Sequence, residues 1–129
     1  MISPRRVQEG ILAAILLSAL PLTTGCHSYQ VETIVENRTG TTIQLLEVDY
    51  PSASFGANTL AAEGVFHYRI QLRGSGPLKV QYTASDDRPV QRLVQIDGPT
   101  LAERQEGRLE IVLLPGGKAE FHPELTPAP

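Results

Sequence analysis

The stretch VFHYRIQLRGSGPLKVQYT, residues 65–83, decides the fold class of this 129-residue chain. Residues 65–72 place Phe, Tyr, Ile and Leu at every second position, with Val, His, Arg and Gln between them. Residues 78–83 alternate Leu, Val and Tyr with Lys, Gln and Thr. A period of two residues is typical of β-strands that bury one face. We therefore predict two strands, joined into a hairpin by the turn-forming residues Gly74–Pro77.

The same period extends to both sides of this stretch. Residues 29–36 alternate, and residues 42–50 alternate with a slip between Leu45 and Leu46, which predicts a β-bulge that keeps the apolar side inward. Small and turn-forming residues fill 52–64, which predicts a long connection with room for one short strand.

Further strands are predicted on the C-terminal side. Residues 90–96 have mixed faces, as an edge strand would, and are closed by Asp97-Gly98-Pro99. A polar link with one helical turn at 100–103 then leads to a strand over 109–114. Residues 119–129, which carry Pro123, Pro127 and Pro129, are predicted to be an irregular tail with room for a short strand at 119–122.

Six or seven short strands follow from these patterns, and no helical segment is long enough for a βαβ crossover. We predict an all-β fold: a small antiparallel β-sandwich, immunoglobulin-like or transthyretin-like, over residues 31–118. A small barrel is the alternative, because the same pattern fits both arrangements.

Residues 1–26 carry a different pattern. Arg5 and Arg6 precede an apolar run from Ile11 to Leu22, and Thr23-Thr24-Gly25 then lead to the only cysteine, Cys26. The run is shorter than the roughly 20 residues of a transmembrane helix, so it indicates a secretory signal peptide. With Cys26 it resembles the lipobox of bacterial lipoproteins. A plain secretory peptide cut elsewhere, which would leave Cys26 free, is the alternative.

The lipoprotein resemblance implies cleavage after residue 25, a diacylglyceryl group on Cys26, and a short tether over residues 26–30. The partner would then be membrane lipid, held through acylated Cys26. His27 stands where an aspartate favours retention in the inner membrane, which implies the outer membrane, facing the periplasm. Lipidation of Cys26 would also leave the mature domain without a thiol, and so without a disulfide or a thiolate metal site.

Charge and composition argue against nucleic acid as a partner. The formal net charge is −3, and removal of Arg5, Arg6 and Glu9 with the signal peptide makes it one unit more negative. Acids and bases are interspersed, so no basic stripe is present, and tryptophan is absent.

Residues with catalytic or metal-binding chemistry are scattered. His27, His67 and His122 lack ligand-like spacing, and Asp86 and Asp87 are explained by a turn. There is no nucleophile elbow, and residues 74–76 lack the length of a phosphate loop. We therefore predict no catalytic, metal or cofactor site and no enzymatic activity.

Two polar features receive structural interpretations. The sequon at Asn37 is interpreted as turn chemistry rather than a glycosylation site. His67 and Arg69 form a polar stripe on one strand face, continued by Gln71 and Arg73, and such a stripe is more often solvated than functional.

The leading hypothesis is a membrane-anchored lipoprotein of the cell envelope, whose sandwich is a non-catalytic module that binds another envelope protein or helps an assembly. Its exposed strand edges are suited to strand addition. The alternative is a periplasmic lipoprotein that binds a small ligand or a metal through residues 52–64 or the histidines.

Overall fold

The computed structural model describes residues 29–84 and 91–129. The regular secondary structure in those ranges consists of strands alone, so the all-β prediction is confirmed. The described residues form eight strands rather than the six or seven predicted. They are β1 Val31–Asn37, β2 Ile43–Asp49, β3 Ser54–Leu60, β4 Val65–Ile70, β5 Gly76–Ala84, β6 Arg92–Leu101, β7 Gln105–Leu114 and β8 Lys118–Pro127.

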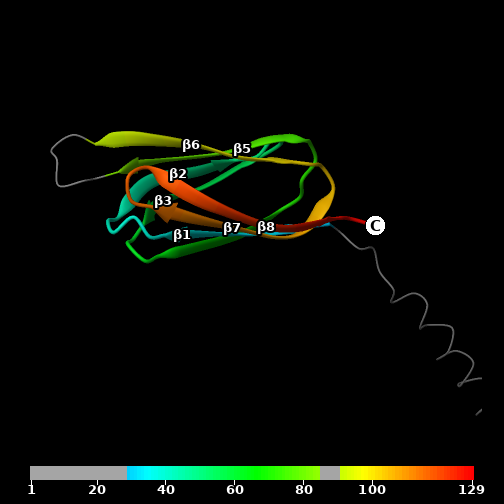
Figure 1. Ribbon diagram of the computed structural model, residues 1–129, viewed down its shortest axis with the longest axis horizontal. Helices are drawn as coiled ribbons and strands as arrows, with labels where there is room; N and C mark the ends of the chain where they lie inside the picture. Colours follow the sequence, from blue (N-terminus) through cyan, green and yellow to red (C-terminus); the bar gives the residue numbers. More distant parts are fainter. Residues whose placement is uncertain (1–28, 85–90) are drawn as a thin grey trace, which may run out of the picture.

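The strands form two four-stranded sheets that face each other as a sandwich (Figure 1). Sheet A has the strand order β4-β1-β7-β8, and sheet B has the order β3-β2-β5-β6. Neighbours pair antiparallel except β1 and β7, which are parallel. Parallel neighbours need a long connection, and the chain provides it by visiting sheet B between them. Of the two predicted arrangements, the sandwich is the one observed.

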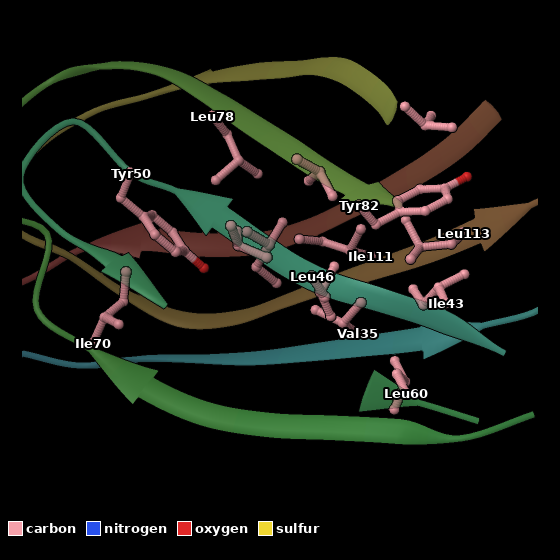
Figure 2. Close-up of a cluster of buried hydrophobic side chains, with 14 of the residues drawn as sticks. Val35, Ile43, Leu46, Tyr50, Leu60, Ile70, Leu78, Tyr82, Ile111 and Leu113 are labelled. Atoms are coloured by element: carbon pink, nitrogen blue, oxygen red, sulfur yellow. The ribbon is translucent and has the colours of Figure 1, made fainter. Parts of the chain in front are cut away.

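Alternate residues of each strand fill the space between the sheets (Figure 2). Full burial of an aliphatic side chain contributes about 1.5–3 kcal/mol, so this layer is the main source of stability. The buried core residues are Val31, Val35, Ile43, Leu46, Val48, Tyr50, Leu60, Ile70, Leu72, Leu78, Val80, Tyr82, Ala84, Val94, Leu101, Leu109, Ile111 and Leu113.

The predicted hairpin within residues 65–83 is wrong. β4 pairs with β1, whereas β5 pairs with β2 and β6 in the other sheet. Residues 71–75 therefore carry the chain from sheet A to sheet B, and Leu72 is buried in the core on the way. The alternation locates both strands correctly. It does not identify their neighbours, because strands in either sheet turn the same apolar face toward the same core.

The C-terminal segment is also different from the prediction. Residues 118–127 form β8, which pairs with β7 along its whole length, from Lys118 opposite Leu114 to Pro127 opposite Gln105. The sandwich therefore extends beyond the boundary predicted at residue 118. As the last strand of sheet A, β8 has one unpaired edge, and such an edge tolerates proline.

Two connections are more regular than predicted. Residues 54–60 form the full strand β3 rather than a short one, and β6 continues through Gly98 and Pro99 to Leu101. No helical turn forms at 100–103: β6 and β7 are joined by a tight turn in which Arg104 has a φ of 56°. The prediction that the residues after 90 form an edge strand is confirmed, because β6 is the last strand of sheet B.

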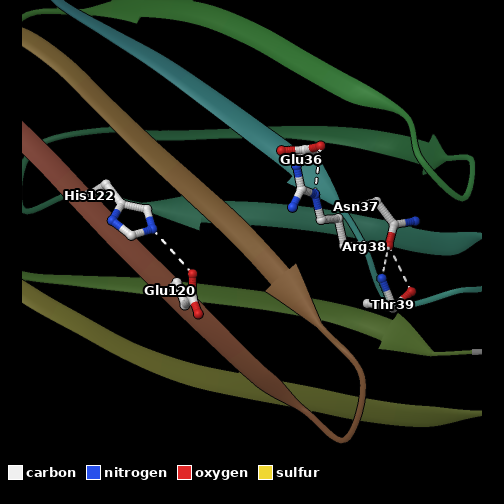
Figure 3. A network of polar contacts seen from close by, with 6 residues as sticks. All are labelled: Glu36, Asn37, Arg38, Thr39, Glu120 and His122. Carbon is white, nitrogen blue, oxygen red and sulfur yellow. Dashed lines mark hydrogen bonds and ion pairs between the residues drawn. The ribbon is translucent and has the colours of Figure 1, made fainter.

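Asn37 fixes the turn after β1, as the turn interpretation of the sequon expects. Its side chain is fully buried, and its Oδ1 accepts hydrogen bonds from the backbone N–H and hydroxyl of Thr39 (Figure 3). Its Nδ2 donates to the carbonyl oxygens of Thr41, Leu60 and Ala61 at 2.9–3.1 Å. The amide thus joins the end of β1, the turn before β2 and the end of β3.

Candidate functional site

The outer face of sheet A carries charge of both signs. In the ladder register, Arg69, Glu32, Arg108 and Glu124 lie side by side across its four strands. Positive and negative residues alternate across neighbouring strands, so opposite charges face each other. Each such exposed pair stabilises the fold by at most about 1 kcal/mol. This face has the character of a solvated surface.

The structure does not bring the two described histidines together. His67 lies on β4 and His122 on β8, at the two outer edges of sheet A, with β1 and β7 between them. Each is near a glutamate instead. His67 Nδ1 lies 3.6 Å from an Oε1 of Glu32, and His122 Nε2 lies 3.3 Å from Glu120 Oε2 (Figure 3). In residues 29–84 and 91–129, no three His, Cys, Asp or Glu side chains are grouped to hold a metal ion.

The polar stripe predicted on residues 67–73 is present only in part. His67 and Arg69 are exposed on β4, opposite residues of β1 that face outward. Gln71 and Arg73 follow the end of the strand, and Arg73 Nη2 donates to Gln71 Oε1 at 3.0 Å.

The outer face of sheet B differs, because one row of described residues across β2, β5 and β6 is uncharged. Gln44, Thr83 and Leu93 lie side by side on β2, β5 and β6, and Leu93 is 60% exposed. The next row in the register, Glu47, Gln81 and Gln95, is linked by hydrogen bonds from Gln81 Nε2 to Glu47 at 2.6 Å and from Gln95 Nε2 to Gln81 at 3.5 Å.

Leu45 projects from this face at the β-bulge. The β2–β5 register shifts between Gln44 and Glu47, as the sequence slip predicts. The bulge keeps Ile43 and Leu46 in the core, but it turns Leu45 outward, where its side chain is 64% exposed. The expectation that the whole apolar side stays inward is therefore wrong for Leu45.

Leu45 is also conformationally strained. Its φ is 52°, in the left-handed region that costs a residue with a Cβ about 1–2 kcal/mol. An exposed leucine held at that cost is an outlier from which a functional hypothesis is justified. The sequence signals the bulge, but it carries no signal for which leucine is exposed.

A shallow groove of about 320 Å³ lies beside Leu45, between β2 and β3. Gly56 is one of its lining residues, and a Cβ added there would lie 2.2 Å from the carbonyl oxygen of Leu46. The close approach of the β2 backbone therefore excludes a side chain at residue 56. Its lining residues are Leu45, Leu46, Glu47, Ser54, Phe55, Gly56, Ala57 and Asn58.

Two carboxylates lie beside the groove on β2. The pKa of Glu47 is raised, first by its hydrogen bond with Asp49 and by that group's negative charge, and then by partial desolvation; the hydrogen bond from Gln81 opposes the shift. Ser54 Oγ donates to Asp49 Oδ1 at 2.6 Å. Lys79 is opposite Asp49 in the ladder, and Asp97 is opposite Lys79. This end of the face is therefore rich in negative charge.

β3, which forms the other wall of the groove, is an edge strand without charge or proline. The three other edge strands of the described chain carry protective residues. β4 has His67 and Arg69, β6 has Pro99 and two charged residues, and β8 has two prolines within a charged sequence. Charge and proline on an edge prevent unwanted pairing. Among these four edges, β3 alone is open to an added strand.

A cluster of three hydroxyl groups, which the sequence does not reveal, lies in the interior. The hydroxyls of Thr33 and Tyr50 hydrogen-bond to each other, and Tyr68 donates to Tyr50 at 3.3 Å. Phe55 stacks on Tyr68 with ring centroids 4.7 Å apart. Burial raises the pKa of both tyrosines. This group is satisfied internally, so its role is structural.

Several residues singled out in the sequence, namely Cys26, His27, Asp86 and Asp87, lie outside the described residues. Within the described part of the chain, no helix is sufficiently long and apolar to span a membrane.

None of the protein-family models, curated proteins or solved structures compared with the chain matches it.

Proposed function

We propose that the protein is a membrane-anchored lipoprotein of the cell envelope and that its sandwich is a non-catalytic module for binding another envelope protein. The observation that carries the proposal is the lipobox-like sequence ending at Cys26, placed only a few residues before the first strand, Val31–Asn37. The resemblance implies acylation of Cys26. His27 favours the outer membrane, with the domain facing the periplasm.

The tether places one end of the sandwich near the lipid surface. Tyr29 is three positions after Cys26, a separation that spans at most about 11 Å when the chain is extended. The guanidinium carbon of Arg104 lies over the ring of Tyr29, 5.7 Å from the ring centroid. The N–H of Gly107 donates a hydrogen bond to the carbonyl oxygen of Gln30. The start of β1, the β6–β7 turn and the C-terminal end lie together at this end (Figure 1).

A binding role is favoured by the open β3 edge and by the groove beside Leu45. The space between the sheets is packed with aliphatic and tyrosine side chains (Figure 2), and the groove beside Leu45, with its apolar and charged walls, lies on the surface. A protein segment suits an open surface groove better than a small ligand does, because small ligands bind in concave sites that bury most of their surface. The separation of His67 from His122 gives no support to the metal-binding alternative.

Metabolic labelling tests the anchor. Cells would be grown with an alkyne fatty acid, and wild type would be compared with Cys26→Ala and, as the matched control, His27→Ala. We expect label in wild type and His27→Ala and none in Cys26→Ala. Intact mass spectrometry should find a mature chain that begins at residue 26 with added acyl mass. Label that persists in Cys26→Ala, or a mature chain with an unmodified thiol, would overturn the proposal.

A further inference from the structure

We propose that the free edge of β3 accepts an extended, otherwise uncharged segment of a second envelope protein, and that one lysine or arginine of that segment lies across Gly56 toward Glu47. The inference rests on the proposed function, since the choice of a different protein as partner depends on the anchor at Cys26.

The backbone of β3 has the groups that strand addition requires. Tyr50 N–H donates to the carbonyl of Ala53 at 2.8 Å, which sets the hydrogen-bonding phase of the β2–β3 hairpin. Because antiparallel pairing alternates between bonded and non-bonded residues, the N–H and C=O groups of Ser54 and Gly56 point away from β2. These residues are exposed, and nothing in the described chain pairs with this edge.

The groove defines the side chain that the added strand carries opposite Gly56. Gly56 pairs with Glu47 in the ladder and both residues line the groove, so a long side chain carried opposite Gly56 would extend along the groove toward Glu47. Leu45 lines the same groove and offers an apolar wall. A long side chain with an aliphatic stem and a positive end matches both features, as lysine and arginine do. Asp49, which accepts a hydrogen bond from the lining residue Ser54, adds a second negative charge beside the groove.

A second copy of this chain does not fit the edge. Antiparallel pairing of two β3 strands relates the copies by a two-fold axis, which reverses their strand directions. β3 contains no lysine or arginine, so a second copy paired in this way would bring no positive side chain opposite Gly56. Parallel pairing of identical edges does not close and leads to fibres.

The test uses the full-length lipidated protein in detergent and two synthetic peptides. One is an acetylated and amidated nine-residue peptide of alternating threonine and valine with lysine at its centre; the other has glutamate there. Affinity would be measured by fluorescence anisotropy, and the binding edge by amide chemical-shift changes. The variant is Glu47→Lys. The matched control is Glu120→Lys, which makes the same charge change on the outer face of sheet A.

We expect the lysine peptide to bind wild type about fivefold more tightly than the glutamate peptide, as one exposed charge pair allows. The preference should invert in Glu47→Lys and persist in Glu120→Lys, with shift changes concentrated in residues 54–60. Equal binding of the two peptides, or shift changes on β4, β6 or β8 instead, would overturn the proposal. A stable dimer through β3 in sedimentation without peptide would also overturn it. Fatty-acid labelling tests the anchor separately, so the two failures are distinguishable.

Discussion

The hydroxyl groups of Thr33 on β1 and Tyr50 at the end of β2 hydrogen-bond to each other across the interior, and so join the two sheets. Thr33 is fully buried and Tyr50 is 5% exposed. A buried polar group that loses its partner costs about 1–3 kcal/mol, whereas removal of both partners costs less. This bond therefore specifies how β1 and β2 align, beyond what the aliphatic core requires.

Replacement of one partner should be more harmful than replacement of both. Tyr50→Phe removes the hydroxyl that both Thr33 and Tyr68 contact, and we expect it to lower the free energy of unfolding by about 1–3 kcal/mol. The double variant Thr33→Val with Tyr50→Phe should lose less than the sum of the two single variants. Urea unfolding of all four proteins measures this coupling. Strict additivity would show that the two hydroxyls do not interact.

Alkaline pH should unfold the domain through its buried phenols. Burial raises the pKa of Tyr50 and Tyr68, and Tyr50 adds to the shift at Tyr68. Because the folded pKa lies above the unfolded value of about 10, the stability from the neutral phenols is present below that pH and is lost as the pH rises above it. Absorbance at 295 nm should therefore show only some of the four tyrosines ionising before far-UV circular dichroism is lost. Ionisation of all four in the folded state would contradict this.

Asn37 should not tolerate aspartate. Its Nδ2 faces the carbonyl oxygens of Thr41, Leu60 and Ala61. A carboxylate in that place donates to none of them and meets three acceptors at close range. We expect Asn37→Asp to cost at least about 3 kcal/mol near neutral pH, as loss of a buried hydrogen-bond network does. Asn58→Asp, at an exposed position on β3, is the matched control and should be nearly neutral. Thermal unfolding distinguishes the two.

Adjacent leucines should respond in opposite directions. Leu45→Gly relieves the left-handed strain at φ 52° and removes an exposed apolar side chain, so we expect equal stability or a gain of up to about 1 kcal/mol. Leu46→Ala removes a core side chain and should cost about 2–5 kcal/mol. Chemical denaturation of both variants measures the contrast. A large loss in Leu45→Gly would show that Leu45 packs inward.

The carboxylates on β2 should be coupled in titration. Asp49 raises the pKa of Glu47, so the contribution of Glu47 to stability is present below its unfolded pKa and is lost as the pH rises through the folded pKa. Asp49→Asn should lower the pKa of Glu47 toward its ordinary value and increase relative stability as the pH rises through the carboxylate range. Carbon-detected NMR titration of Glu47 in both proteins tests this. An unchanged pKa would mean that Asp49 is not the cause.

The fold class could be predicted from sequence because most strands are amphipathic. Ile43 and Leu46, for example, are an odd number of positions apart yet both face inward, and this slip alone indicates a bulge. Strand pairing could not be predicted. Ile70 and Leu78 face one shared core from different sheets, so their alternation carries no information on which strand lies beside which.

The candidate site was less accessible to sequence analysis. β3 has no strong alternation, because its outward positions are Ser54, Gly56 and Asn58 and only one bulky residue, Leu60, is fully in the core. Gly56, which lines the groove, lies against the Leu46 carbonyl, and this contact between strands appears only once the register is known. The signal at Cys26, by contrast, is local and is read directly from consecutive residues.

Hydrogen exchange of the Ser54 and Gly56 amides, with and without the lysine peptide, tests the central claim most directly. Both N–H groups point away from β2, so we predict rapid exchange in the free protein and strong protection when an added strand accepts their hydrogen bonds. Ala57, whose N–H faces β2, serves as the internal control and should change little. Binding of the peptide without protection of Ser54 and Gly56 would contradict strand addition at β3.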